Sequence, residues 1–173
     1  VHGSNADQRR PARWSRLIGF EGRLYAYWYE EDTNGTTRIR VAVKRESPTG
    51  PSWAFVDNGG LNTSRDHEAL YASVSLHDGT LYAAWQESNG SAYQIRYAAY
   101  NGNDAAPEWS LLDGGGSAGI NWDETKDAYY PKLLSHTGTL YRLWPEKSGG
   151  SQQMRAAAYN GNDLNPAWSS IET

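Results

Sequence analysis

The sequence predicts an all-β fold made of three consecutive four-stranded antiparallel sheets. One pattern, Gly-x-Leu-Tyr-x-x-Trp, occurs three times and ends at Trp28, Trp85 and Trp144, in steps of 57 and 59 residues. Each copy is followed by an Arg and, thirteen residues after that Arg, by the Trp of a Pro-x-Trp sequence. No helical apolar period of useful length appears. Repeats of this length are typical of solenoids, propellers or arrays.

The middle unit shows how four strands fit into one repeat. Asp78-Gly79 and Asn89-Gly90 supply the positive φ angles that tight two-residue hairpins need. Residues 101–107 read as a longer turn, and the glycine-rich residues 114–119 read as a flexible connector to the next unit. Between these signals lie partly alternating apolar segments, which predict strands at residues 69–77, 81–87, 93–100 and 109–113.

The first and third units repeat this layout, with Glu21-Gly22 and Thr137-Gly138 at the first turn. Four antiparallel strands per unit, joined by long connectors, form the layout of a β-propeller blade. A β-sandwich or β-prism of three repeated sheets is the alternative. We expect one domain of three blades, at about residues 5–61, 62–120 and 121–173.

The ends of the chain predict how such blades are completed. Three blades in an open arc leave two apolar faces bare, and large bare apolar patches are rare on soluble monomers. Residues 168–173 followed by residues 1–5 resemble residues 53–62, so the tail of one copy and the head of another fit one repeat. We therefore expect a homodimer that closes a six-bladed ring. An excised part of a longer propeller and an engineered repeat protein are the alternatives.

Composition excludes several function classes. The chain has 16 Lys plus Arg against 20 Asp plus Glu, which argues against a nucleic-acid partner. No apolar run is long enough to span a membrane. There is no Cys, and the four His show no metal-ligand spacing. Asp123-x-Thr125-x-Asp127 lacks the rest of a calcium-loop pattern. We expect no metal and no cofactor; the compartment stays open, with a secreted or cell-surface location favoured.

The third turn resembles the Asp-box of sialidase-type propellers, in which a small polar residue, an Asp, a Gly and an aromatic join the third and fourth strands. The resemblance is loose, because the residue order differs and the first unit has the unlike segment 44–53 instead. It implies a structural role, in which the Asp side chain ties the turn and the Trp plugs between strands. The residues that match are Asp104, Trp109, Asp163 and Trp168.

A second resemblance is to small propeller lectins, which are built from short chains that oligomerise into a ring with sugar sites made of Arg, Glu and Trp. The residue types agree, but the order differs from that of the fucose-binding ring lectins, where Arg precedes Glu. One interpretation is a sugar site in each blade. The other is a structural ion pair or cation–π contact. The candidates are Trp28, Glu30 and Arg40; Trp85, Glu87 and Arg96; and Trp144, Glu146 and Arg155.

One rim of the propeller collects the long polar connectors, and binding residues are concentrated on such loops. An aromatic residue follows nine residues after the Asn that opens each unit. These aromatics, Trp14, Tyr71 and Tyr130, join the candidate ligand-binding residues. The alternative is that the connectors are merely solvated.

Repetition decides the predicted function. A sialidase-like site needs three Arg together with a Tyr–Glu nucleophile pair and an acid. Arg40, Arg96 and Arg155 recur at a single repeat position, whereas catalysis needs unlike groups at one centre. We therefore predict no enzyme but a lectin-like carbohydrate-binding module, with weak repeated sites that gain avidity from ring assembly. Its partners would be a second copy of the chain and glycans. A structural or self-assembling scaffold is the alternative, and a sialidase-like glycoside hydrolase is the third.

Overall fold

A computed structural model describes residues 5–6, 9–46, 48, 50–114 and 119–172. Its strands form three separate four-stranded antiparallel sheets, and there is no helix in the part of the chain described. In particular, none of the described residues forms a helix that could cross a membrane. The prediction of an all-β fold with three repeated sheets is confirmed.

Strands follow chain order across each sheet. Blade 1 contains β1 (Ala12–Phe20), β2 (Arg23–Glu31), β3 (Thr37–Arg45) and β4 (Ser52–Phe55). Blade 2 contains β5 (Ala69–His77), β6 (Thr80–Ser88), β7 (Tyr93–Tyr100) and β8 (Trp109–Leu111). Blade 3 contains β9 (Lys132–His136), β10 (Thr139–Ser148), β11 (Ser151–Tyr159) and β12 (Trp168–Ser170).

Tight turns between the first two strands set the register of each blade. Both central residues of these turns have positive φ, as a type I′ hairpin requires. The residue before the glycine is not itself a glycine in any of the three turns. The pairs are Glu21 (φ 49°) with Gly22 (71°), Asp78 (44°) with Gly79 (75°), and Thr137 (47°) with Gly138 (74°).

Apolar cores lie between the blades. We call the contact of blades 1 and 2 joint 1–2, and that of blades 2 and 3 joint 2–3. Joint 1–2 packs tyrosines and β-branched residues of β2 and β3, such as Tyr27 and Val41, against Leu81 and Trp85 of β6. Joint 2–3 packs the outer face of blade 2 against blade 3, where Trp144 is buried.

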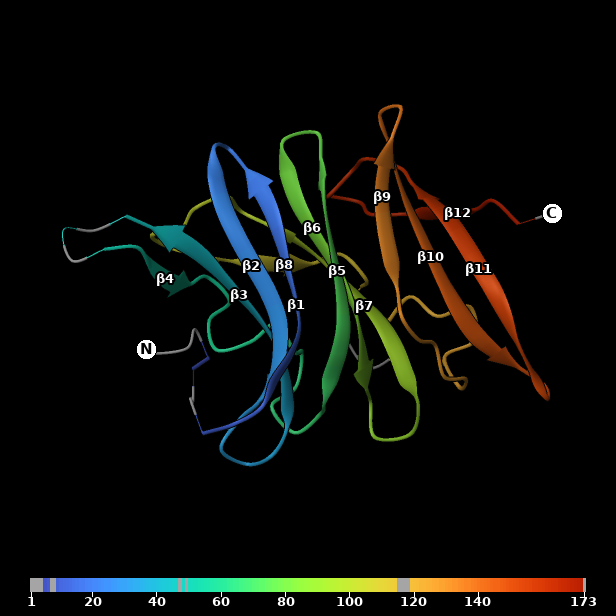
Figure 1. The fold of residues 1–173 in the computed structure, drawn as a ribbon. Helices are drawn as coiled ribbons and strands as arrows, with labels where there is room; N and C mark the ends of the chain where they lie inside the picture. The colour runs from blue at the N-terminus through green and yellow to red at the C-terminus, as the bar shows by residue number, and fades with distance from the viewer. Residues whose placement is uncertain (1–4, 7–8, 47, 49, 115–118, 173) are drawn as a thin grey trace.

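The first strand of each sheet lies beside the first strand of the next, since β1 contacts β5 and β5 contacts β9. These strands therefore line the axis around which the blades are arranged. Figure 1 shows the three sheets side by side, with blade 2 in the middle. Blades 1 and 3 each keep one face that no described sheet covers. Leu24 and Phe55 are exposed on the first of these flanks, and Leu143 and Met154 on the second. The six-bladed ring stays a prediction.

Candidate functional site

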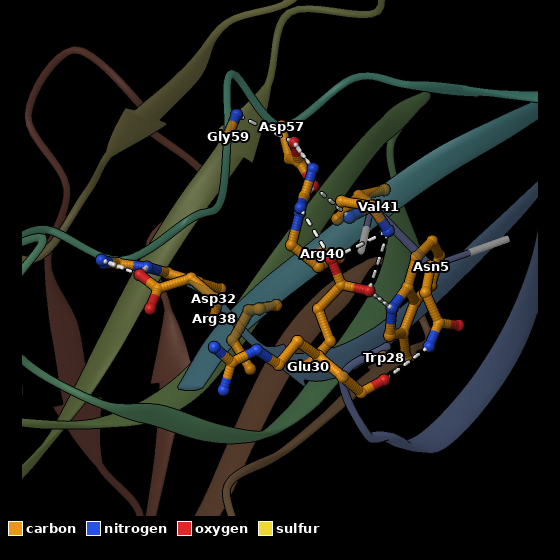
Figure 2. A network of polar contacts seen from close by, with 12 residues as sticks. Asn5, Trp28, Glu30, Asp32, Arg38, Arg40, Val41, Asp57 and Gly59 are labelled. Atoms are coloured by element: carbon orange, nitrogen blue, oxygen red, sulfur yellow. Dashed lines mark hydrogen bonds and ion pairs between the residues drawn. The ribbon is translucent and has the colours of Figure 1, made fainter. Parts of the chain in front are cut away.

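A buried polar network joins the Trp, Glu and Arg that recur in blade 1. Trp28 Nε1 donates to Glu30 Oε2 at 2.9 Å, and Arg40 Nη1 donates to Glu30 Oε1 at 2.9 Å. Arg40 Nε donates to Asp57 Oδ2 at 2.7 Å, and the same oxygen accepts the amide of Val41 at 2.8 Å (Figure 2). The Glu30 and Asp57 charges are therefore compensated inside the fold, as buried charges require.

Blades 2 and 3 repeat two contacts of this network, the Trp–Glu hydrogen bond and the pairing of the Arg with a later acid. The Trp Nε1 to Glu Oε2 distance is 2.8 Å for Trp85 and Glu87, and 3.0 Å for Trp144 and Glu146. In every blade the Arg pairs with an acid seventeen residues further along the chain, as Arg40 does with Asp57. The two other pairs, Arg96 with Asp113 and Arg155 with Glu172, each have an N–O distance of 2.9 Å.

The same glutamates hold the connectors that enter each blade. Glu30 accepts the amide of Ala6 at 3.1 Å, Glu87 accepts that of Thr63 at 2.9 Å, and Glu146 accepts that of Trp122 at 2.8 Å. Each repeated Trp thus binds the Glu of its own blade, and each repeated Arg binds an acid of its own blade. A cavity of about 320 Å³ borders Glu87 and Arg96 in blade 2. A ligand role for these nine residues stays a prediction.

The three rim aromatics do come together. Ring centroids lie 5.5 Å apart for Trp14 and Tyr71, and 4.6 Å apart for Tyr71 and Tyr130. All three residues have left-handed backbone angles, with φ of 59°, 54° and 47°. In β1 and β5 this point coincides with an irregularity in the pairing with the second strand. Such angles cost about 1–3 kcal/mol each for residues other than glycine and often occur at functional sites.

A pocket of about 250 Å³ opens beside these rings on the axial strands. Its walls combine aromatic faces with two cationic side chains, and no Asp or Glu borders it among the described residues. The bordering residues are Trp14, Arg16, Tyr27, Tyr71, Ala72, Ser73, Tyr130 and Lys132.

From this pocket the ring contacts continue toward the connectors of joint 2–3. Tyr130 lies 6.0 Å from Tyr129, and Tyr129 lies 5.8 Å from Tyr93, measured between ring centroids. We call the five rings Trp14, Tyr71, Tyr130, Tyr129 and Tyr93 the aromatic run. A continuous row of aromatic rings offers stacking surfaces for several sugar units, because each ring has an apolar face and a polar tip.

Two carboxylates bind Tyr93 at one end of the aromatic run, one at its hydroxyl and one at its backbone amide. The hydroxyl of Tyr93 donates to Glu68, and the amide of Tyr93 donates to Asp127 Oδ1 at 2.8 Å. Glu68 directly precedes β5, and Asp127 occupies the equivalent position of the next blade, just before the buried Ala128. Lys147 Nζ lies 2.6 Å from Asp127 Oδ2. We call the first three residues the Glu68–Tyr93–Asp127 cluster.

The surroundings keep these groups in different protonation states. Partial burial pushes the pKa of Asp127 up, but hydrogen bonds from Lys147 and from the Tyr93 amide outweigh it and bring this pKa below its usual value. Burial, followed by the bond to Glu68, raises the pKa of Tyr93 well above its usual value. At neutral pH Asp127 is therefore ionised and Tyr93 keeps its proton.

Sequence reasoning placed Glu68 and Asp127 among the polar residues of the connector rim without giving them a role, and it missed Tyr93. The sequence held one signal for Tyr93, namely that its position in the repeat is occupied by a different kind of residue in the other two units. The position of Tyr93 holds Thr37 in unit one and Gln152 in unit three. Within the described residues, no group of three or more His, Cys, Asp or Glu is placed to hold a metal ion.

The Asp residues of the third turns bind across the joints. Asp104 accepts the hydroxyl of Tyr25 from blade 1 and that of Tyr100 from blade 2, both at 2.8 Å. Asp163 likewise accepts the hydroxyls of Tyr82, at 3.1 Å, and Tyr159, at 2.5 Å. The turn itself is held by asparagines, since Asn103 N donates to Asn101 Oδ1 at 3.0 Å. This differs from the turn-tying role that the Asp-box resemblance implies.

Comparison with known proteins gives matches only among solved structures: no protein-family profile and no curated protein sequence matches the chain. A thermostable family-43 glycoside hydrolase matches with 16% identity and a TM-score of 0.56, over 94% of this chain and 55% of that one. An α-L-arabinofuranosidase from Lactobacillus brevis matches with 18% identity and a TM-score of 0.54, over 92% and 54%. An endo-arabinase from Bacteroides thetaiotaomicron matches with 17% identity and a TM-score of 0.56, over 91% and 61%.

These likenesses support a propeller-type fold, and the chain spans little more than half the length of the structures it matches. They contradict the prediction of a lectin-like protein without enzymatic activity, because the neighbours are glycoside hydrolases. The scaffold alternative also loses support. That prediction weighed only residues that repeat, whereas the unlike residues Glu68, Tyr93 and Asp127 are hydrogen-bonded together across joint 2–3.

Proposed function

We propose that this chain hydrolyses glycosidic bonds at the Glu68–Tyr93–Asp127 cluster. The observation that carries the proposal is that carboxylates from adjacent blades bind one tyrosine at the end of the aromatic run, Glu68 at its hydroxyl and Asp127 at its amide. Glycoside hydrolysis generally uses a pair of carboxyl groups that flank the scissile bond. The hydrolase names of the solved neighbours support the same class of reaction.

The environment of Asp127 suggests its role. Asp127 is held in the ionised form by Lys147 and the Tyr93 amide, which suits a general base or nucleophile toward the anomeric carbon. Glu68 is the other carboxyl group of the pair, fixed by the phenol of Tyr93, and we assign it the role of the acid that protonates the leaving oxygen. The acid and base come from two blades, so the packing of joint 2–3 sets their separation.

The substrate class follows from the aromatic run. Stacking on Tyr129, Tyr130 and Tyr71 would carry an oligosaccharide from the carboxylates toward the axial pocket. We propose an arabinose-containing glycan as the first substrate to test, since two of the structural neighbours are named an α-L-arabinofuranosidase and an endo-arabinase.

The test is an assay of the full chain on aryl α-L-arabinofuranosides and linear arabinan, with release of the aryl alcohol and of reducing ends as readouts. Asp127→Asn and Glu68→Gln should each lower kcat/KM by about a hundredfold or more, as expected for loss of an acid or base. Glu31→Gln is the matched control: Glu31 is a half-buried carboxylate beside the rim of joint 1–2, and its replacement should leave the rate unchanged.

Two results would contradict the proposal. The first is full activity in both Asp127→Asn and Glu68→Gln, which would move the reaction elsewhere on the chain. The second is the absence of hydrolysis by the unmodified chain on a panel of arabinan, xylan, galactan and their aryl glycosides.

We also propose that a second copy of the chain covers the two open flanks and completes a ring of six blades. The exposed apolar residues on both flanks, among them Leu24 and Met154, support this assembly. The Glu68–Tyr93–Asp127 cluster lies wholly within blades 2 and 3 of one chain. Hydrolysis and ring closure can therefore be tested separately.

A further inference from the structure

An asparagine at the head of a blade binds the strand edge of the blade before it. Its Oδ1 accepts a backbone amide, and its Nδ2 donates to the carbonyl two residues earlier on the same strand. Paired with the edge in this way, the asparagine satisfies backbone groups that β-sheet pairing leaves open. In joint 1–2, Asn62 accepts the amide of Ile39 at 3.1 Å and donates to the carbonyl of Thr37 at 2.9 Å. In joint 2–3, Asn121 accepts the amide of Ile95 at 2.8 Å and donates to the carbonyl of Tyr93 at 2.9 Å.

The connector lies flat against that edge. The residue before each asparagine adds a backbone bond, from Leu61 N to Ile39 O at 3.0 Å and from Ile120 N to Ile95 O at 2.9 Å. A Cβ at Gly119 would stand 2.7 Å from Ile95 O, so a residue with a side chain could not lie there without a backbone shift. We call this arrangement of asparagine and strand edge the asparagine latch.

Blade 1 carries the first half of a third latch. Asn5 occupies the position of Asn62 and Asn121, and it makes the same bond within its own connector, from Nδ2 to Arg10 O at 3.0 Å. The corresponding distances are 2.7 Å for both Asn62 and Asn121. The next amide, Ala6 N, is held by Glu30. Asn5 is thus oriented for a strand edge, yet no described strand precedes blade 1.

Blade 3 carries the second half. Met154 on β11 is the repeat counterpart of Ile39 and Ile95, and no Asn from the described residues binds this edge. Its side chain is 55% exposed, whereas both isoleucines are 0% exposed. The flank around it is apolar, with Leu143 and Ile171 also exposed. One end of the molecule therefore offers the asparagine and the other end offers the edge.

We propose that a second copy of this chain docks head to tail, with Asn5 of one copy latched on β11 of the other. Asn5 Oδ1 would accept the amide of Met154, and Nδ2 would donate to the carbonyl of Gln152. This inference deepens the proposed ring and rests on it. A head-to-tail contact between identical chains closes into a ring when the rotation permits, and two copies would form two identical joints. The two internal joints of this chain supply the template for both.

The proposed joint between two copies lacks one contact that joints 1–2 and 2–3 have. Blade 1 has Pro48 where blades 2 and 3 have Asp104 and Asp163, so Tyr141, the counterpart of Tyr25 and Tyr82, gains no aspartate. The latch and the apolar flank must then hold the copies together. We therefore expect a dimer whose population depends on concentration.

Light scattering and sedimentation over a range of concentrations test the inference. The unmodified chain should approach twice its mass of 19.2 kDa. Met154→Glu should raise the dissociation constant about tenfold or more, because it places a charge in a covered apolar contact. Met154→Ile, which restores the residue type of the other two units, should keep or tighten the dimer. Asn5→Ala should weaken it several-fold through the loss of about two hydrogen bonds.

A monomer at every concentration would overturn the inference, and so would a dimer that is indifferent to both Met154→Glu and Asn5→Ala. Met154 is exposed in the single chain, so far-UV circular dichroism should confirm that its variants fold. Hydrolysis is measured on the same samples. A monomer that hydrolyses the substrates would overturn the proposed dimer contact but support the proposed activity. A dimer without hydrolysis would support the contact and contradict the activity.

Discussion

Joint 1–2 and joint 2–3 are built from the same repeat positions, yet they differ in their cores. At the second-strand position that faces the preceding blade, joint 1–2 has the fully buried Ala83, and joint 2–3 has Arg142, which is 8% exposed. The Arg142 guanidinium lies 4.7 Å from the ring centroid of Trp144 and 4.3 Å from that of Trp168. One joint is therefore closed by small apolar residues and the other by a buried cation between two indoles.

The cation in joint 2–3 is poorly compensated. Arg142 Nε and Nη1 have no hydrogen-bond partner among the described residues, and burial lowers the pKa of Arg142 to about 9. The neighbouring indole is affected too. Trp109 Nε1 donates to Val56 O at 2.9 Å in joint 1–2, whereas the buried Trp168 Nε1 has no partner among the described residues. We therefore expect the core of joint 2–3 to contribute less to the free energy of unfolding than the core of joint 1–2.

The two joints also differ in the residues at their rims. Joint 2–3 has the Glu68–Tyr93–Asp127 cluster, and the repeat counterparts of these residues in joint 1–2 are Pro11, Thr37 and Glu68. The joint with the less satisfied core is also the one with the proposed active site. Proteins often depart from ideal packing where function requires it. The comparison teaches that the proposed functional position is marked by a departure from the repeat rather than by the repeat itself.

The largest expected effect comes from giving joint 1–2 the residue of joint 2–3. Ala83→Arg should lower the free energy of unfolding by about 3–5 kcal/mol, because the charge would enter an apolar core without a partner. Urea unfolding followed by tryptophan fluorescence measures this change. An apolar replacement in joint 2–3 is the control: Arg142→Met removes the buried cation and should stabilise the fold by about 1–3 kcal/mol. Equal effects of the same sign would show that the two cores are not different in this way.

Tyr93 tests the difference between the rims. Tyr93→Thr gives joint 2–3 the residue of joint 1–2 and should lower kcat/KM about tenfold, since the carboxyl group of Glu68 loses the phenol that positions it. Tyr93→Phe keeps the ring and removes only the hydroxyl. A shift of the alkaline limb of the pH–rate profile in both variants would indicate positioning of Glu68, the proposed acid, whereas an unchanged profile with a higher KM would indicate sugar stacking alone.

Much of the fold could be predicted from the sequence, because the local signals agree with one another. Residues 69–77 and 93–100 form strands with the predicted bounds, and the Asp-Gly and Glu-Gly turns have the predicted positive φ. The fourth strand of blade 2 ends at Leu111 rather than residue 113, since Leu112 and Asp113 turn toward Tyr97 and Arg96 of β7. Short-range turn chemistry and strand alternation were sufficient for this level of detail.

The candidate site could not be predicted in the same way. Glu68 and Tyr93 lie 25 residues apart within blade 2, and Asp127, which is 34 residues after Tyr93, reaches it only when blade 3 packs on blade 2. No spacing in a single unit encodes that contact. The partners of the repeated arginines were also missed, although the regular separation of seventeen residues to Asp57, Asp113 and Glu172 was available.

The smallest expected effect concerns the tyrosines that bind across the two joints. Burial, reinforced by Asp163, raises the pKa of Tyr82 to about 12, and burial together with Asp104 raises that of Tyr25 further. Because the folded pKa lies above the unfolded value of about 10, this contribution to stability is complete below pH 10 and is lost as the pH rises through 12. Tyr25→Phe and Tyr82→Phe should each lower the free energy of unfolding by about 1 kcal/mol at pH 7. Each variant should also lose less stability than the unmodified chain when the pH is raised. Tyr141→Phe is the matched control, since no aspartate binds this residue in the described chain. The midpoints of urea unfolding between pH 7 and 11.5 measure the effect in all three variants. If Tyr141→Phe flattened the alkaline loss as much as the other two, the joints would not be the source of the pH dependence.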